Sequence, residues 1–324
     1  MKAILSEKYG PPEALKLQEV PKPVPKENQV LIKIHAASLN AADWHLMRGT
    51  PFLMRLVFGG IFNPKFKILG ADIAGTVDTV GSNIKWFKPG DEVFGDISSS
   101  GWGAFAEFAA VKEDTLVLKP TRLSFEEAAA IPLASVTALQ ALRDTGKIKA
   151  GQEVLINGSS GGVGTFAIQI AKNFGANVTA VCSTTKVELA RSLGADKVID
   201  YKSEDFTQSG QLYDLILDIA AFRPLSDYKR ILKPGGAYVL VGGAAGQAMR
   251  VMAFGAIMSM TGNKKISGMM AKPNSGDLTI IKDLIEKGKI SPVIDRKYPF
   301  QELPEAMRYL EEGHARGKII VSIV

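Results

Sequence analysis

Glycines at positions 158, 161 and 164 form the part of the sequence best suited to chemistry. They follow the apolar run 154–156 and lead into a second apolar segment, 165–171. Because glycine has no Cβ, this spacing lets the chain turn tightly and bring its backbone close to a ligand. A helix that begins there presents free N–H groups and its positive dipole end to a phosphate. The pattern predicts a strand, a phosphate-binding turn and a helix. The turn lacks the Gly-Lys-Ser/Thr ending of a nucleotide triphosphatase.

The end of the next apolar run, 177–181, indicates which nucleotide binds. In dinucleotide-binding folds an acidic residue about 20 positions past the glycines binds the ribose 2′-hydroxyl of NAD. Here that place holds Ser183, Thr184 and Lys186. Hydroxyls and a cation suit a 2′-phosphate, which an acid would repel. We therefore predict NADPH as the cofactor. The alternative is that Lys186 is an ordinary solvated residue of a first helical turn.

The elements that must position these residues change character along the chain. Residues 1–125 carry many short alternating segments with Gly and Pro turns, typical of a small barrel. From a capping box at Ser124 and Glu127 onward, apolar strands alternate with helices, which predicts a doubly wound parallel sheet. The expected strands of this sheet are 154–157, 177–181, 197–199, 214–218, 237–241 and 265–270, and the expected helices are 126–131, 135–145, 164–174, 185–193 and 224–232.

The alternation ends near residue 271. Helices are expected at 276–287 and near 303–312, and a last strand, 318–324, should return to the first domain. The predicted fold class is α/β, with a Rossmann domain, 126–270, inserted in a discontinuous, GroES-like β-barrel domain made of 1–125 and 271–324.

Composition excludes several classes of function. The formal charge of the 324 residues is +6, but basic and acidic side chains are interleaved, so nucleic-acid binding has no support. Cys182 is the single cysteine, which rules out an intrachain disulfide and a Cys-rich metal site. The first residues turn polar too soon for a signal peptide, and the longest apolar stretch, 251–260, is too short to span a bilayer. We expect a cytoplasmic protein.

Taken together, these features resemble a known family. The chain resembles the zinc-independent branch of the medium-chain dehydrogenase/reductase superfamily, the quinone oxidoreductase-like enzymes, over essentially its whole length. The segments that carry the resemblance are 1–3, 38–44, 69–75, 87–93, 157–164, 193–196, 198–201 and 314–318.

The zinc-dependent alcohol dehydrogenases of the same superfamily have a Cys-His-Thr-Asp segment and a Gly-His-Glu segment at two of these places. This chain has Asn40-Ala41-Ala42-Asp43 and Gly70-Ala71-Asp72 there, and it lacks the four-cysteine structural site. Zinc needs three or four thiolate, imidazole or carboxylate ligands. We therefore expect no metal.

The resemblance implies a set of cofactor contacts, NADPH as the bound form, and a homodimer. The pyrophosphate turn is expected at Ser160, Gly161, Gly162, Val163 and Gly164, and the 2′-phosphate site at Ser183, Thr184, Lys186 and Tyr201. The remaining expected contacts are Asn40, Thr137, Ala220, Gly242, Gly243 and Lys318. For Tyr201 a packed loop aromatic is the alternative.

Hydride transfer without a metal needs a donor for the oxygen that becomes negative. The candidates, in a predicted loop, are Asn40, His45 and Arg48, with solvent as a further proton source; Asp43 is expected to brace the loop. Two apolar segments, 51–58 (also predicted as a loop) and 252–258, are interpreted as walls of a hydrophobic substrate pocket, as core or subunit packing, or as a peripheral membrane contact.

The predicted function is NADPH-dependent, zinc-free hydride transfer to a quinone or an α,β-unsaturated carbonyl. A zinc-free alcohol or aldehyde dehydrogenase-like enzyme is one alternative. A non-catalytic NADPH-binding sensor on the same fold is another, because a fold alone does not fix a function.

Overall fold

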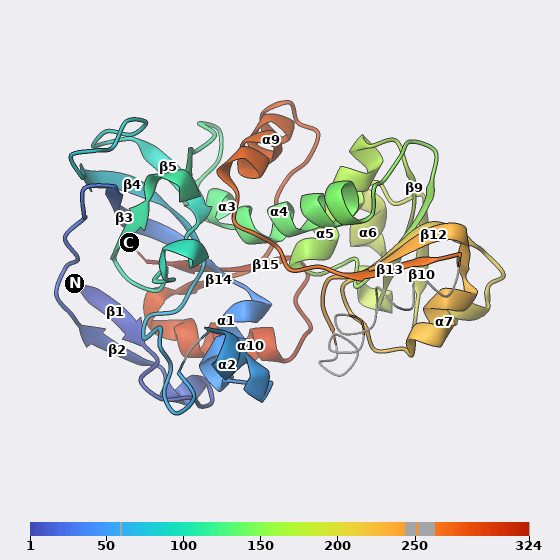
Figure 1. Cartoon of the computed structure of the whole chain (residues 1–324), viewed down its shortest axis with the longest axis horizontal. Helices are drawn as coiled ribbons and strands as arrows, with labels where there is room; N and C mark the ends of the chain where they lie inside the picture. The colour runs from blue at the N-terminus through green and yellow to red at the C-terminus, as the bar shows by residue number, and fades with distance from the viewer. Residues whose placement is uncertain (59, 244–250, 252–262, 324) are drawn as a thin grey trace. The chain divides into compact units, whose positions relative to one another are not determined.

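The computed structural model describes residues 1–58, 60–243, 251 and 263–323 (Figure 1). The chain divides into two compact units, one made of 1–136, 273–287 and 292–324 and the other of 137–272 and 288–291. We call them the barrel unit and the nucleotide unit. Residues 126–136 group with the barrel unit, whereas the sequence prediction places the boundary at 125/126. Helix α4 (Pro132–Gln140) contains the change from one unit to the other.

The barrel unit is built on one mixed sheet with the strand order β14-β15-β3-β4-β5-β7, with β6 also paired to β3. Its strands are β3 (Gln29–Leu39), β4 (Asp72–Val80), β5 (Glu92–Asp96), β6 (Phe108–Lys112), β7 (Leu116–Leu118), β14 (Ile294–Pro299) and β15 (Lys318–Ser322), and a separate hairpin pairs β1 (Lys2–Leu5) with β2 (Lys16–Glu19). The last strand, β15, runs antiparallel to β3, which confirms the predicted return to the first domain.

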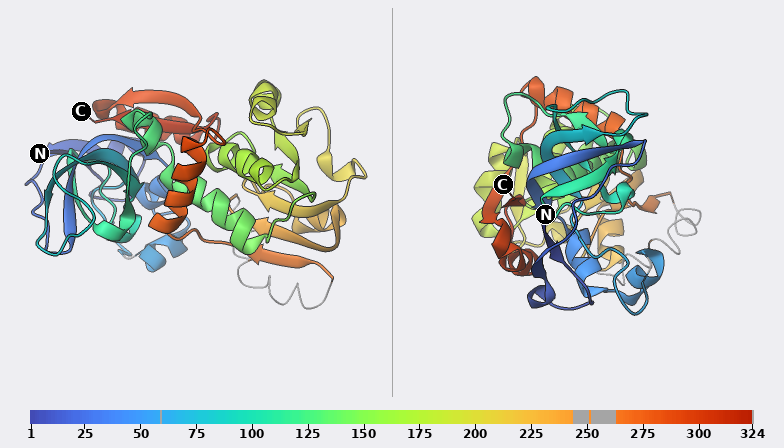
Figure 2. Two further views of the ribbon diagram at one scale, coloured as in Figure 1. Left: turned by 90° about the horizontal axis from the view of Figure 1, so that it is seen from above. Right: turned by 90° about the vertical axis from the view of Figure 1, so that its left-hand side faces the viewer.

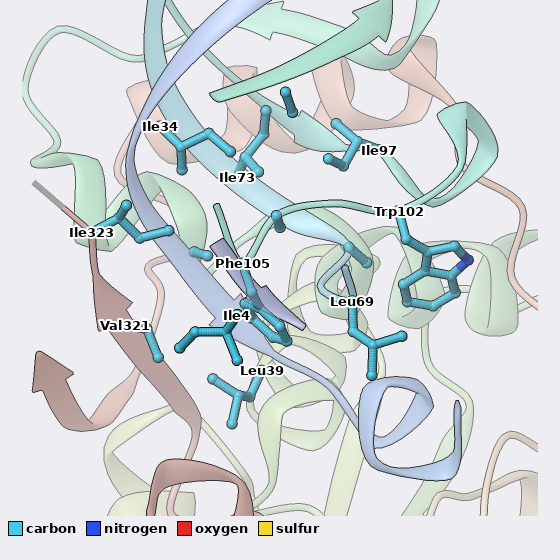
Figure 3. Packing of buried hydrophobic residues seen from close by; sticks show 14 of the residues in the cluster. Ile4, Ile34, Leu39, Leu69, Ile73, Ile97, Trp102, Phe105, Val321 and Ile323 are labelled. Atoms are coloured by element: carbon cyan, nitrogen blue, oxygen red, sulfur yellow. The ribbon is translucent and has the colours of Figure 1, made fainter. Parts of the chain in front are cut away.

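Alternating apolar side chains of these strands form the core of the barrel unit. Ile34 and Leu39 of β3, Ile73 of β4 and Val321 of β15 point into one buried cluster with Phe105 (Figure 3). Each of these side chains is almost completely removed from water. Burial of this kind contributes about 1.5–3 kcal/mol per large apolar side chain, so the cluster fixes where the ends of β3, β4 and β15 lie.

The barrel unit also contains α1 (Ala41–Arg48), α2 (Phe52–Phe58), α3 (Phe125–Ala129), α9 (Ser275–Glu286) and α10 (Leu303–Glu311). The capping box of Ser124 and Glu127 is confirmed at the start of α3. The loop predicted around 40–58 is wrong, because α1 and α2 lie there. Helix α1 is bounded by Asn40 at its N-cap and by Gly49, which ends it in the left-handed conformation at φ 63°.

The nucleotide unit holds a parallel sheet in the order β10-β9-β8-β11-β12-β13. Its strands are β8 (Glu153–Asn157), β9 (Asn177–Cys182), β10 (Lys197–Asp200), β11 (Tyr213–Asp218), β12 (Leu232–Leu240) and β13 (Lys265–Gly268). This order is that of the doubly wound dinucleotide fold. The prediction is confirmed, although β12 begins at Leu232, earlier than the expected strand 237–241.

Helices α5 (Gly162–Asn173) and α6 (Val187–Ser192) pack along β8, β9 and β10, and α7 (Leu225–Arg230) packs against β12 (Figure 2). The apolar segment 252–258, interpreted from sequence as a pocket wall or packing surface, lies outside the described residues. In the part of the chain that the structure describes, no helix is both long and apolar enough to cross a bilayer.

Candidate functional site

The glycine turn of the nucleotide unit lies at the point where the order of the sheet reverses, between β8 and its neighbour β11. Gly158 follows β8 with φ +79°, a conformation that favours glycine. A Cβ on Gly158 would lie 2.8 Å from the Cβ of Ala220, which follows β11. The two chain segments thus approach each other at the carboxyl ends of β8 and β11, where doubly wound folds bind their ligands.

The other two glycines of the turn have different surroundings. A Cβ on Gly164 would lie 2.3 Å from the carbonyl oxygen of Gly158, so Gly164 is needed for helix α5 to pack against the turn that follows β8. A Cβ on Gly161 would have its nearest neighbour 3.9 Å away and would project into open space. Gly161 is the N-cap residue of α5, and having no side chain it leaves the first-turn amides of the helix without a cap.

The turn therefore suits an anion. Open space lies in front of a helix N-terminus whose backbone amides have no intrahelical acceptor. The structure brings the predicted residues Ser160, Gly161, Gly162 and Val163 together around this N-terminus. A pyrophosphate fits this geometry, so the nucleotide unit has the place that a dinucleotide cofactor requires.

The predicted 2′-phosphate site lies at the ends of β9 and β10. Ser183 follows β9, and Thr184 and Lys186 form the short helical turn Thr184–Lys186 after it. The register pairs Asp200 of β10 with Cys182, and the backbone N–H of Tyr201 donates to the Cys182 carbonyl at 3.1 Å. Tyr201 is 53% exposed, which leaves its ring open to a ligand.

Sequence reasoning gave no role to Asp200, whose carboxylate lies beside Thr184. A hydrogen bond from the Thr184 side chain, followed by the backbone N–H of Lys202, lowers the pKa of Asp200. Asp200 therefore carries its charge at neutral pH. The end of β9 thus presents the hydroxyls of Ser183 and Thr184 and the ammonium of Lys186, with the charged carboxylate of Asp200 beside Thr184.

A second feature that sequence reasoning missed links the ends of β8 and β11 to each other and to β12. The buried Asn157 Nδ2 donates to Asp218 Oδ1 at 2.7 Å and to the Ala220 carbonyl at 2.9 Å. Tyr238 donates to the other oxygen of Asp218 at 2.7 Å. The signal in the sequence is a polar residue at the carboxyl end of each of two apolar strands, 154–157 and 214–218.

These bonds position the remaining predicted contacts of the nucleotide unit. Ala220 follows β11 in the loop held by Asn157, and a parallel bridge joins Ala221 to Gly243. A Cβ on Gly242 would lie 2.8 Å from the Ile219 carbonyl, so the two loops are in close contact. Thr137 is buried in α4. The structure therefore brings Ala220, Gly242 and Gly243 together; their cofactor contacts and that of Thr137 stay predictions.

In the barrel unit, helix α1 and its N-cap carry the three proton-donor candidates, each with different contacts. The guanidinium of Arg48 forms a bidentate ion pair with Glu311 of α10, with Nε 2.6 Å from Oε1 and Nη2 2.8 Å from Oε2. His45 Nδ1 lies 2.7 Å from the carbonyl of Thr50, and burial lowers the pKa of His45. His45 is therefore neutral at pH 7, with Nδ1 donating to that carbonyl and Nε2 accepting.

Asn40 lies in a buried polar cluster at the ends of β3, β4 and β15. Its Oδ1 accepts from Lys318 Nζ at 2.5 Å, and its Nδ2 donates to Asp72 Oδ2 at 2.9 Å. Lys318 Nζ also donates to the Leu39 carbonyl at 3.1 Å and lies 3.2 Å from Asp72 Oδ2. These three acceptors of Lys318 all belong to the barrel unit. The cofactor contact expected of Lys318 stays a prediction.

Asp43 braces the start of α1, as expected. Its Oδ2 accepts from the backbone N–H of Asn40 at 2.7 Å. Its side chain is fully buried, and Oδ1 has no hydrogen-bond partner among the described residues. Burial raises the pKa of Asp43 to about 8; the Asn40 N–H opposes this rise, and the Asp72 carboxylate adds to it. Asp43 is therefore largely protonated at pH 7. Burial and then Asp72 also raise the pKa of Asp96.

These raised pKa values predict how stability depends on pH. The ordinary pKa of an aspartate is 3.8, so between pH 4 and pH 8 the folded chain holds a proton on Asp43 that the unfolded chain has lost. The free energy of unfolding should fall as pH rises through this window, by up to about 1.4 kcal/mol per pH unit. Asp43→Asn should reduce this slope and leave only the part of the pH dependence that comes from Asp96. Urea unfolding from pH 5 to pH 8.5 measures it, and equal slopes in the two proteins would contradict the raised pKa.

Comparison with known proteins places this geometry in a family. The family model "Alcohol dehydrogenase GroES-like domain" matches residues 26–121, and the model "Zinc-binding dehydrogenase" matches residues 193–321. The chloroplast envelope quinone oxidoreductase homolog of Arabidopsis thaliana is 37% identical over 99% of this chain and 98% of its own length. The chain belongs to the quinone oxidoreductase-like family of medium-chain dehydrogenases/reductases.

Two further proteins are similar to this quinone oxidoreductase-like chain. The NADPH-dependent alkenal/one oxidoreductase of Arabidopsis thaliana, a chloroplastic protein, is 37% identical over 99% of this chain and 79% of its own length. The crystal structure of Escherichia coli quinone oxidoreductase complexed with NADPH superposes with a TM-score of 0.86 at 26% identity and covers 100% of both chains.

The name of the second family model, "Zinc-binding dehydrogenase", raises the question of whether the residues of this chain suit zinc. Within the described residues, no group of three or more His, Cys, Asp and Glu side chains is placed to hold a metal ion. At the two motif positions where the zinc-dependent relatives differ, Asn40 and Asp72 both contact the ammonium of Lys318. A second cation beside this ammonium would be repelled, so the residues of this quinone oxidoreductase-like chain do not fit a zinc ion at this place.

Proposed function

We propose that this protein is an NADPH-dependent reductase that transfers a hydride to a quinone or to an α,β-unsaturated carbonyl without a metal. The observation that carries the proposal is the uncapped N-terminus of α5 at the reversal point of the sheet, with open space in front of Gly161. Ser183 and Lys186 at the end of β9 favour NADPH over NADH. The names of two relatives, a quinone oxidoreductase and an NADPH-dependent alkenal/one oxidoreductase, support both substrate classes.

The nicotinamide cofactor supplies the hydride when it is bound. The first-turn amides of α5 would bind the pyrophosphate, and Ser183, Lys186 and Tyr201 would bind the 2′-phosphate. The loops that contain Ala220 and Gly243 would border the ribose and the nicotinamide. These contacts would orient the cofactor, and orientation is one of the contributions a protein makes to a transfer of this kind.

The proton that completes the reduction needs a source. His45 is neutral at pH 7, and its Nδ1–H is already donated to the Thr50 carbonyl. The Arg48 guanidinium is held by Glu311. We therefore propose solvent as the proton source. Asn40 Nδ2 donates to Asp72 Oδ2 at 2.9 Å and, over a long 3.5 Å, to the Ser38 carbonyl, so the second of these N–H groups is the one that would turn toward the developing charge on the substrate oxygen.

A direct test is the loss of NADPH absorbance when the purified protein is mixed with a set of quinones, enones and aldehydes. We expect turnover with quinones or enones and little with aldehydes. Binding of NADPH without turnover of any of them would favour a non-catalytic sensor. Turnover of aldehydes alone would favour an alcohol or aldehyde dehydrogenase-like enzyme. Failure to bind NADPH would contradict the proposal.

The choice between the two nicotinamide cofactors gives a further prediction. Lys186→Ala should raise the Kd of NADPH about tenfold or more, because one charge-assisted contact contributes about 1.5–3 kcal/mol. The Kd of NADH should stay nearly unchanged. Lys197→Ala is the matched control, since Lys197 is exposed and begins β10, at the other end of the strand from Asp200 and the predicted 2′-phosphate site. Calorimetric titration measures both constants, and an equal loss for the two cofactors would argue against a 2′-phosphate site at Lys186.

A homodimer and a cytoplasmic location are also part of the proposal. The single cysteine, Cys182, is buried and suits a reducing compartment. Several relatives are named as chloroplastic or mitochondrial proteins, so fractionation of the source cells is the relevant test of location. Light scattering of the purified protein tests the dimer.

A further inference from the structure

The buried cluster around Lys318 has an unusual composition for a barrel core. Lys318 is the first residue of β15 and is only 3% exposed. Its backbone N–H donates to the Val293 carbonyl at 2.8 Å, and Gly317 before it has φ +116°. A Cβ on Gly317 would lie 2.4 Å from that same carbonyl, so glycine is required there. The chain thus places this lysine in the interior at a fixed point.

The ammonium of Lys318 is fully used by its surroundings. An ammonium has three N–H donors, and Lys318 Nζ has three acceptors, the Leu39 carbonyl, Asn40 Oδ1 and Asp72 Oδ2, at 3.1, 2.5 and 3.2 Å. A buried ammonium is costly unless it is paired and hydrogen-bonded in this way. Asp72 therefore supplies the counter-charge on which the burial of Lys318 depends.

Asp72 is equally well satisfied. Its side chain is fully buried, and Oδ2 accepts from Ser38 Oγ at 2.8 Å as well as from Asn40 and Lys318. Its Oδ1 accepts from the backbone N–H of Leu133 in the first turn of α4 at 2.8 Å. Four donors on one carboxylate fix it in place.

The two charged groups together determine how the Asn40 amide is oriented. Oδ1 faces a cation and Nδ2 faces an anion, so the amide cannot turn over without losing both contacts. Asn40 and Asp72 stand where the zinc-dependent relatives have a cysteine and a glutamate. We infer that the Lys318 ammonium is the resident cation of this site in place of a metal ion, and that it is a positioning residue that holds the Asn40 amide for the reduction. The inference rests on the proposed function.

The test compares Lys318→Met with a matched lysine elsewhere in the barrel unit. Lys119 is also buried, and its Nζ donates to the carbonyls of Pro120 and Leu123 and pairs with Glu92. Both substitutions remove a buried ammonium, but the polar partners of Lys119 do not include Asn40. We expect Lys318→Met to lower kcat about tenfold or more and Lys119→Met to leave kcat within about twofold. The Kd of NADPH should stay within about twofold of wild type in Lys318→Met, because the three acceptors of Lys318 all lie in the barrel unit; a large rise in this Kd would favour the cofactor contact predicted from sequence and overturn the inference.

Lys318→Met leaves Asp72 buried without its partner and risks a poorly folded protein. The double variant Lys318→Met/Asp72→Asn removes both charges and should regain much of the urea midpoint while kcat stays low. In an Asn40→Ala background, Lys318→Met should lower kcat by a much smaller factor, because Lys318 acts through Asn40. A double variant with wild-type kcat, or a folded Lys318→Met with wild-type kcat, would overturn the inference.

Zinc content supplies a readout that does not depend on activity. After incubation with ZnCl₂ and desalting, the wild-type protein should retain no stoichiometric zinc. One zinc per chain that disappears in Asp72→Asn would show that a metal, not the ammonium, is the cation of the site. If the wild type reduces no quinone or enone, the proposed function fails. Two measurements then still decide whether Lys318 is the resident cation: the zinc content, and the coupling between Lys318→Met and Asp72→Asn in urea unfolding.

Discussion

Gly161→Asp is expected to abolish NADPH binding at micromolar concentrations while leaving the fold at least as stable as in the wild type. Gly161 has φ −83°, which any residue adopts, and its Cβ would meet open space. Aspartate is a preferred N-cap residue, so its carboxylate would accept from the first-turn amides of α5 and stabilise the helix by about 1 kcal/mol. The same carboxylate occupies the amides that a pyrophosphate needs and repels it. Loss of two charge-assisted contacts corresponds to a Kd raised about 100-fold or more.

Gly161→Asn separates the two causes of this loss. Asparagine is also a good N-cap and competes for the same amides, but it carries no charge. We expect a smaller increase in Kd than for aspartate and a similar gain in the midpoint of urea unfolding. Titration of NADPH by fluorescence and urea unfolding of both variants measure these effects. Unchanged NADPH affinity in Gly161→Asp would place the pyrophosphate elsewhere and remove the main support of the proposed function.

This contrast between stability and binding explains why the glycine turn was predictable from sequence. Glycines 158 and 164 are needed because the nearest atoms would lie 2.8 and 2.3 Å from an added Cβ, and Gly161 leaves open the space where we propose that the pyrophosphate binds. Both needs are local, so a short stretch of sequence between an apolar strand and a helix carries them. The parallel sheet was predictable for a similar reason, because strands such as 214–218 are buried on both faces and read as apolar runs.

The barrel unit was harder to predict because several of its elements carry weak local patterns. Strand β14 contains Asp295, Arg296 and Lys297 and lies at the edge of the sheet, where charged side chains are favoured and alternation is lost. The only sequence signals of helix α1 lie at its two ends, Asn40 as N-cap and Gly49 as the left-handed end.

The polar cluster could not be predicted in any detail. Its members come from β3, β4, β15 and the start of α4, and the residues that meet, Asn40, Asp72 and Lys318, are separated by long stretches of chain. The sequence analysis named Lys318 only as an expected cofactor contact, and only tertiary structure shows that it is buried beside Asn40 and Asp72. What sequence did indicate is the departure from the zinc motif, since Asn40 and Asp72 were singled out by comparison with Cys and Glu in the zinc-dependent relatives.

Asp72→Asn is expected to be among the most destabilising conservative substitutions in the barrel unit. It leaves the Lys318 ammonium buried without a counter-charge, and breaking a buried pair in this way costs about 3–5 kcal/mol. Asp78 is the matched control, because it lies in the same strand, β4, and pairs with Lys22 at 2.8 Å, with the two side chains 31% and 43% exposed. Asp78→Asn should cost about 0–1 kcal/mol, as exposed ion pairs do.

Urea unfolding of the two variants measures this difference directly. Stability losses of similar size would mean that the Asp72 carboxylate is not the counter-charge of Lys318. The double variant Asp72→Asn/Lys318→Met gives a second expected result. Its loss of stability should be smaller than that of Asp72→Asn alone, because the uncompensated ammonium is removed along with its partner. If stability recovers in the double variant, the barrel unit needs only that the pair carry no net charge. If kcat stays low in the same variant, the reaction needs the ammonium itself. The two readouts together distinguish a charge kept for folding from a charge kept for chemistry.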